Sequence, residues 1–260
     1  MTKRSLIALA FAVALPVTML AQGRGGAQQP ARSPKEAAPT DLTGYWVSLV
    51  TEDWRWRMVT PIKGDSASVP INQAAKQIMN NWDPAKDEAA GNQCKGYGAP
   101  AIMRAPGRVH ITWQDDNTLK VETDAGTQTR LLRFGSTASK SEVPSWQGSS
   151  VARWDTGITP VGGQLPLGLG QRQGVRSRSL EVVTTNLKPG YLRKNGVPYS
   201  AKATVTEYFE RFAEPDGNDH LMVMTIVTDP EYLAIPFVVT SDFKKEPDGS
   251  KWDPSPCYAR

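Results

Sequence analysis

The feature that most constrains the fold is a succession of short segments rich in β-branched and aromatic residues. Turn-forming Asp, Asn, Gly and Pro residues separate most of them, so successive strands are expected to pair as antiparallel hairpins. This pattern predicts an all-β fold, either an up-and-down barrel or a β-sandwich. The nine segments are 44–58, 108–114, 118–123, 128–134, 149–155, 179–186, 203–212, 220–228 and 235–245.

One short amphipathic helix is expected after the first strand. Ser68 is placed to cap it, Pro70 suits its first turn, and the apolar residues from Ile71 to Trp82 recur at helical spacing. We expect this apolar face to cover a barrel end or a sheet. A second non-strand feature is the glycine-rich stretch 157–178, whose length is typical of a lid, a binding loop or disorder.

The amino terminus has the pattern of an export signal. Residues 1–21 combine a basic start with a short apolar run, which predicts a secretory signal peptide. Residues 22–40 are rich in Gly, Gln, Ala and Pro, and predict a flexible linker. Residues 41–260 then form a single β-barrel domain, periplasmic or secreted, with no membrane span in the mature chain.

Charge and cysteine content narrow the function classes. Without Lys3 and Arg4, 28 basic residues face 26 acidic ones, and these are scattered along the chain, so nucleic acid is not an expected partner. Cys94 and Cys257 are either two free thiols or one disulfide, and an oxidising compartment favours the disulfide. The spacing of cysteines and histidines does not fit a zinc site, and no cofactor is expected.

The first strand segment, 44–58, combines tryptophans with charged residues in the sequence GYWVSLVTEDWRWRM. Taken as one strand, it places Trp54 and Trp56 on one face and Asp53 and Arg55 on the other. The second face changes from apolar to charged along its length, as in a strand that leaves a core for a wet rim or one with a bulge midway. The charged half is either a solvated rim or the wall of a binding site, and we predict that it lies at a cavity mouth.

The segment 108–114, RVHITWQ, alternates in the same way. His110 lies between hydrogen-bonding neighbours, and as a general base it needs a carboxylate to orient it. The candidate carboxylates are Asp53, Glu52 and Glu122. Arg108 on the polar face and Trp113 on the apolar face are candidate ligand contacts. A solvated outer face explains the pattern equally simply.

A third candidate lies in the stretch 188–200, KPGYLRKNGVPYS, which connects two strands. Tyr191, Arg193 and Tyr199 offer hydrogen-bond donors and stacking surfaces, and two glycines permit unusual backbone conformations. A basic, aromatic loop of this kind at a barrel mouth could hold an anionic or aromatic ligand. It could also be a solvated hairpin loop.

Several ordered motifs together resemble a family of proteins. An early Gly44-x-Trp46, the strand containing Ser150 and Trp154, the Asp229-Pro230 turn and a terminal cysteine recur in a broad set of exported bacterial proteins with lipocalin-like β-barrels. The resemblance spans most of residues 41–260. It implies a closed antiparallel barrel that holds one small, mostly apolar ligand, with Trp46 as a structural residue in its floor. The resemblance does not imply any particular activity for this chain.

Three functional hypotheses follow. The first is an exported barrel that binds a small hydrophobic or aromatic molecule, with Arg55, His110 and Tyr191 supplying polar contacts. The second is a hydrolase, lyase or isomerase on the same barrel, with His110 as acid/base, Asp53 orienting it, and Tyr191 or Arg193 stabilising negative charge. The third is an envelope interaction module, which predicts an exposed aromatic patch.

Overall fold

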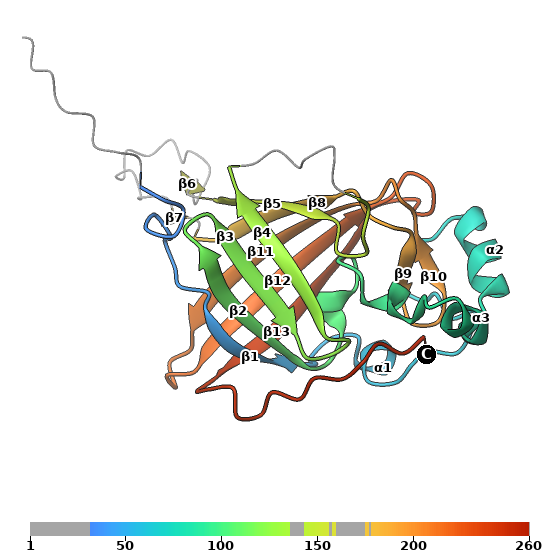
Figure 1. The fold of residues 1–260 in the computed structure, drawn as a ribbon, viewed down its shortest axis with the longest axis horizontal. Helices are drawn as coiled ribbons and strands as arrows, with labels where there is room; N and C mark the ends of the chain where they lie inside the picture. Colours follow the sequence, from blue (N-terminus) through green and yellow to red (C-terminus); the bar gives the residue numbers. More distant parts are fainter. Residues whose placement is uncertain (1–31, 136–142, 156–157, 160–174, 177, 260) are drawn as a thin grey trace, which may run out of the picture. The chain divides into compact units, whose positions relative to one another are not determined.

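Nine strands form a closed barrel in the computed structural model, which confirms the predicted all-β barrel with a short helix (Figure 1). The structure describes residues 32–135, 143–155, 158–159, 175–176 and 178–259, which form one compact unit. Around the barrel the strands follow the order β1-β13-β12-β11-β8-β5-β4-β3-β2. Their bounds are β1 Gly44–Leu49, β2 Arg108–Asp115, β3 Thr118–Thr123, β4 Gln128–Phe134, β5 Ser149–Trp154, β8 Leu180–Thr185, β11 Thr204–Ala213, β12 Asp219–Thr228 and β13 Phe237–Glu246.

The other elements are not strands of the barrel. They are two short pairs of strands, three helices and two 3₁₀ turns. They are β6 (Ile158–Thr159) with β7 (Val175–Arg176), β9 (Gly190–Arg193) with β10 (Val197–Tyr199), α1 (Trp54–Arg57), α2 (Gln73–Asn81), α3 (Pro84–Ala89), η1 (Gln93–Tyr97) and η2 (Ile102–Arg104). Among the described helices, none is long and apolar enough to cross a membrane.

The barrel has two distinct ends. The turn end carries the tight turns at 115–117 and 214–218, which join β2 to β3 and β11 to β12. The helical end is the opposite one, where η2 contacts β13 and where α2 packs against the β9–β10 hairpin (Figure 1). Residues 32–40, the second part of the predicted linker, contact the turn end through the Lys35 amide and the Asp116 carbonyl. Residues 1–31, which include the predicted signal peptide, lie outside the described residues, as does most of the predicted loop 157–178.

One strand pair departs from the expected antiparallel order. β4 and β5 are parallel, with Leu132 opposite Ser150. Both strands therefore begin at the helical end and run in the same direction. The Trp146 carbonyl, just before β5, already accepts from the Ala99 amide at the helical end. The expectation of short hairpin links fails here because 14 residues separate Phe134 from Ser149.

The middle of the barrel is filled with side chains. Inward-facing residues from most strands have at most 1% of their surface exposed, and a ligand-sized cavity would leave such surfaces accessible. They include Trp46, Ile111, Leu119, Leu132, Leu180, Phe209, Leu221 and Phe243. Arg130 and Glu207 form a buried ion pair across this interior, with Thr184 as a further partner of Arg130. Space for a ligand must therefore be sought at the ends.

Two local predictions about the first third of the chain were wrong in detail. The strand predicted for 44–58 ends at Leu49, and Trp54–Arg57 form the helical turn α1. The predicted helix begins at Gln73, where the Asn72 side chain accepts from the Ala75 amide, and Ser68 does not cap it. Residues 70–71 pair with residues 233–234 instead of joining the helix. The chain is therefore extended at these residues and becomes helical only from Gln73.

The predicted disulfide is confirmed. Cys94 in η1 is bonded to Cys257 in the C-terminal tail, 163 residues later. The tail, red in Figure 1, runs along the outside of the barrel from β13 towards the helical end. The Ser255 amide donates to the Asp124 carbonyl on the way. The disulfide therefore fastens the end of the chain to the elements that cover the helical end.

Candidate functional site

Three buried arginines from separate parts of the sequence gather at the helical end. Arg57 ends α1, Arg104 ends η2 and Arg193 ends β9, and each is at most 9% exposed. We call these three residues the arginine cluster. Charged side chains are seldom buried without a partner, because the loss of hydration is costly. The partners of each guanidinium therefore indicate what the site can do.

Each guanidinium nitrogen of Arg57 donates a hydrogen bond to another group of the protein. Its Nε donates to the Arg104 carbonyl at 2.9 Å, its Nη2 to the Ser48 hydroxyl at 3.2 Å, and its Nη1 to Glu52. Burial lowers the pKa of Arg57, and the carboxylate of Glu52 opposes this shift. These bonds hold α1 against η2. They require the chain to turn back over the barrel end after β1, which explains why the charged half of the predicted strand is a helical turn.

Arg104 has hydrogen-bond partners for only part of its guanidinium. Its Nη2 donates to the Asp53 carboxylate at 2.8 Å, and its guanidinium carbon lies 5.6 Å from the centre of the Phe237 ring. Its buried Nη1 has no hydrogen-bond partner among the described residues. Asp53 itself precedes α1 in the left-handed conformation, with φ of 51°, which non-glycine residues adopt infrequently. The predicted site residue Asp53 is thus a partner of Arg104.

Arg193 has no hydrogen-bond acceptor at all within the described structure. Its Nε, Nη1 and Nη2 are buried and unpaired, although only 5% of the residue is exposed. The guanidinium stacks on the Trp56 ring, 4.9 Å from its centre. Burial first, and then the positive charge of Arg104, lower the pKa of Arg193 to about 10, whereas Asp53 and Asp65 act in the opposite direction. Arg193 still carries its charge at neutral pH.

Trp56 covers Arg193 and is itself held in place. Its indole Nε1 donates to Asp65 at 3.0 Å, and the Arg55 guanidinium lies 5.5 Å from its ring centre. The turn of the β9–β10 hairpin fixes the segment that carries Asp65, since the buried Asn195 amide donates to the Ile62 and Asp65 carbonyls. Two predicted site residues, Arg55 and Arg193, therefore both contact the ring of a third, Trp56. Trp54, on the same turn, is 66% exposed.

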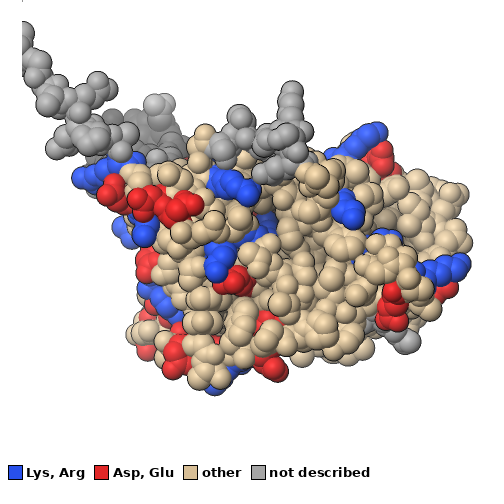
Figure 2. Space-filling view, in the orientation of Figure 1, with Lys and Arg blue, Asp and Glu red and all other residues tan. Residues whose placement is uncertain are grey.

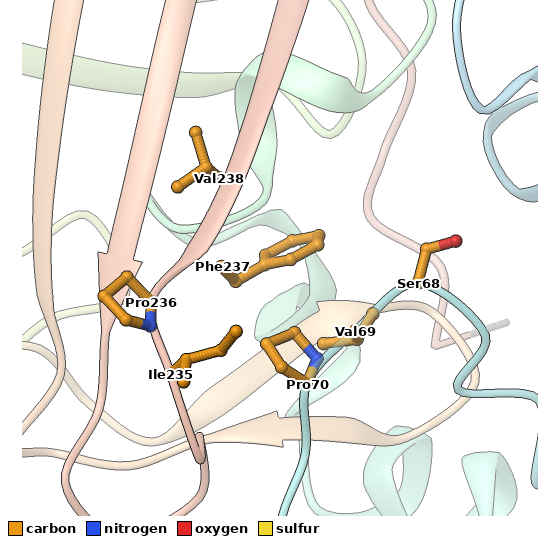
Figure 3. Close-up of a pocket in the computed structure, with 7 residues that line it drawn as sticks. All are labelled: Ser68, Val69, Pro70, Ile235, Pro236, Phe237 and Val238. Atoms are coloured by element: carbon orange, nitrogen blue, oxygen red, sulfur yellow. The ribbon is translucent and has the colours of Figure 1, made fainter.

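An apolar hollow lies beside the cluster (Figure 3). It has a volume of about 450 Å³ and lies between residues 68–70 and the start of β13. In Figure 3, Ile235 and Phe237 from one segment face Val69 and Pro70 from the other. Phe237 is the residue that joins the hollow to the cluster, because the Arg104 guanidinium lies over its ring.

His110 lies elsewhere, on the outer face of the barrel wall. Its ring stacks on Tyr45 with 3.9 Å between ring centres, and Trp252 of the C-terminal tail packs edge-on at 6.2 Å. Its Nδ1 is 3.3 Å from Glu122, one of the three candidate carboxylates and its neighbour across β2 and β3. These contacts attach the tail to the wall. Asp53 and Arg193, two of the other three predicted catalytic groups, lie at the helical end with Arg104.

The remaining candidates form their contacts with residues outside the arginine cluster. Tyr191 donates to Asp87 at 2.7 Å, and burial and then this carboxylate raise the pKa of its phenol. Tyr199 ends β10, and its side chain is buried in the core that the hairpin shares with α2, where burial alone raises its phenol pKa. Arg108 pairs with Glu246 at 2.8 Å. Trp113 stacks on Phe134 at 5.6 Å near the turn end, together with Trp154.

Sequence reasoning missed Arg104, Arg57 and Phe237 as members of this region. A signal for Arg104 is present, since it follows the five apolar residues 99–103 directly, and a charge in an apolar run is expected to be buried with a partner. Arg57 and Phe237 carry no comparable signal, because the contacts that involve them join distant segments. On the face shown in Figure 2, positive and negative side chains are interspersed, as the scattered charges of the sequence predict.

We searched protein-family models, curated proteins and solved structures for similar proteins, and none of them matches this chain.

Proposed function

We propose that the protein is an exported, lipocalin-like binding protein that holds a small apolar or aromatic molecule at the helical end of its barrel. The observation that carries the proposal is the apolar hollow of about 450 Å³ that adjoins the buried arginine cluster through Phe237. Ligand sites typically combine apolar walls with a few well-placed polar groups. The predicted signal peptide and the disulfide support export, because disulfides persist in oxidising compartments.

Because side chains fill the middle of the barrel, the helical end is favoured over the barrel interior as the binding site. Side chains in the middle of the barrel leave no accessible surface, whereas Ile235 and Val238 beside the hollow are 65% and 54% exposed. Covering such apolar side chains with a ligand removes them from water, which favours binding.

The test is a binding screen with a matched pair of variants. Thermal shift and native mass spectrometry of the purified protein against aromatic, terpenoid and lipid compounds should identify at least one class that raises Tm. Val238→Trp fills the hollow and should weaken binding of those compounds by roughly 10-fold or more, because filling the hollow removes the ligand's apolar contacts. Val143→Trp, at a site that is 87% exposed and outside the hollow, should bind normally. The proposal fails if no class binds, or if both variants bind alike.

The exposed side chains also favour a second candidate, the envelope interaction module. Trp54, Met58, Val59 and Ile62 are each at least 59% exposed and lie within nine residues of one another. Large exposed apolar groups that lie together are typical of protein contact sites. Trp54→Ser with Met58→Ser should leave small-molecule binding in the hollow nearly unchanged if this surface serves a protein partner. A loss of small-molecule binding in this variant would assign the surface to the ligand site instead.

A further inference from the structure

One member of the arginine cluster is not paired with a carboxylate among the described residues. Arg57 pairs with Glu52, Arg104 with Asp53, and the exposed Arg55 with Asp65 at 3.7 Å. Arg193 alone among these four arginines forms no salt bridge within the described structure, and it is the one with three unpaired nitrogens. A buried guanidinium without an acceptor is costly, so its retention points to an acceptor that the chain does not itself supply.

We propose that Arg193, assisted by Nη1 of Arg104, binds an oxyanion group of the ligand, and that the preferred ligand is an aromatic or apolar carboxylate. This inference rests on the proposed function, whose site it specifies further. The guanidinium presents its donors in a planar fork that matches the two oxygens of a carboxylate. The unpaired Nη1 of Arg104 adds a donor beside Phe237, which lines the hollow for the apolar part of the molecule.

Trp56 can report on this oxyanion site. Its ring lies over the face of the Arg193 guanidinium, whereas a carboxylate binds the fork in the plane of the guanidinium, so a bound anion changes the charge that the indole faces. The ring is attached to the body through one hydrogen bond to Asp65 and belongs to a helix of only four residues. Anion binding should therefore change the fluorescence of Trp56, which serves as a readout independent of affinity.

The experiment compares matched acids and amides on the full mature chain. Naphthoate and phenylbutyrate, with their neutral amides, are titrated by calorimetry. Because the chain has 8 tryptophans, the fluorescence change on adding phenylbutyrate is compared with that of Trp56→Phe, and the part lost in this variant is assigned to Trp56. Charge-assisted hydrogen bonds predict that each acid binds roughly 10- to 100-fold more tightly than its amide. Arg193→Met should abolish this preference and the fluorescence change. Arg193→Lys, which keeps the charge without the fork, should recover part of the preference, and Arg153→Met, at an exposed ion pair, should keep all of it.

The outcomes separate the two proposals. Equal binding of acid and amide to the wild type retains the proposed function and overturns the oxyanion site, as does an unchanged preference in Arg193→Met. If neither series binds, the wider screen of aromatic, terpenoid and lipid compounds decides the proposed function, and acetate and phosphate decide the oxyanion site. A rise in Tm with acetate or phosphate in the wild type but not in Arg193→Met supports the site. The anion that gives the larger rise shows whether the site prefers a carboxylate or a phosphate. Equal Tm in both proteins overturns it.

Discussion

Replacing Arg193 with methionine should stabilise the ligand-free protein, although it removes a buried side chain. A fall of the pKa from 12.5 to about 10 means that the charged native state is disfavoured by roughly 3 kcal/mol relative to the unfolded chain. Methionine retains most of the apolar stem but loses the cation–π contact with Trp56, worth about 0.5 to 2 kcal/mol. We expect the variant to gain about 1 to 2 kcal/mol, a rise in Tm of roughly 2 to 8 °C.

The assay is urea unfolding at pH 7, with Arg153→Met as the control. Arg153 is 69% exposed and paired with Glu181, so its removal should change the free energy of unfolding by less than about 0.5 kcal/mol. The pH dependence provides a second check. The folded pKa of Arg193 is lowered, so its cost is fully present below the folded value and is lost as the pH rises above it. The gain should thus be constant from pH 6 to 9 and shrink above pH 10.

The reasoning about Arg193 is refuted if the methionine variant unfolds more than about 1 kcal/mol more easily than the wild type, since burying an unpaired charge cannot then be its main effect. Such a loss would mean that the guanidinium is satisfied in the native protein and has a structural role. A gain in stability combined with a loss of acid binding would show instead that the protein sacrifices stability at this position for binding.

Three further predictions concern other parts of the molecule. Replacing Cys94 and Cys257 with serine should destabilise the protein by roughly 2 to 5 kcal/mol, because the disulfide closes a long loop; denaturation with and without reductant measures this. Glu207→Ala should cost about 3 to 5 kcal/mol by leaving Arg130 buried without its partner, whereas the double change Arg130→Met with Glu207→Leu should recover most of the loss in a mutant cycle. Burial raises the pKa of the Tyr191 phenol, so the unfolded chain releases this proton first and stability falls above pH 10; Tyr191→Phe should fall less steeply in unfolding experiments between pH 10 and 11.

Local patterns determined much of the barrel. The alternation of apolar and polar residues in β2, β3 and β12 is sufficient to assign their faces, because successive side chains of a strand point to opposite sides. The turns at 115–117 and 214–218 follow from residues that favour reversal of the chain. The disulfide follows from two cysteines in a chain whose first residues predict an export signal. Each of these features depends on neighbours in the sequence or on the compartment.

The site depended on contacts that no local pattern contains. Arg57, Arg104 and Arg193 are separated by 47 and 89 residues, and only closure of the barrel brings their segments to one end. The same contacts overrode the strand pattern at 54–57, because an extended chain would carry Arg57 away from Ser48 and the Arg104 carbonyl. The sequence by itself therefore determined the strands and the cysteine pair. The tertiary structure alone decided which arginine lacks a carboxylate, because ion pairing at short range depends on distances between segments far apart in the chain.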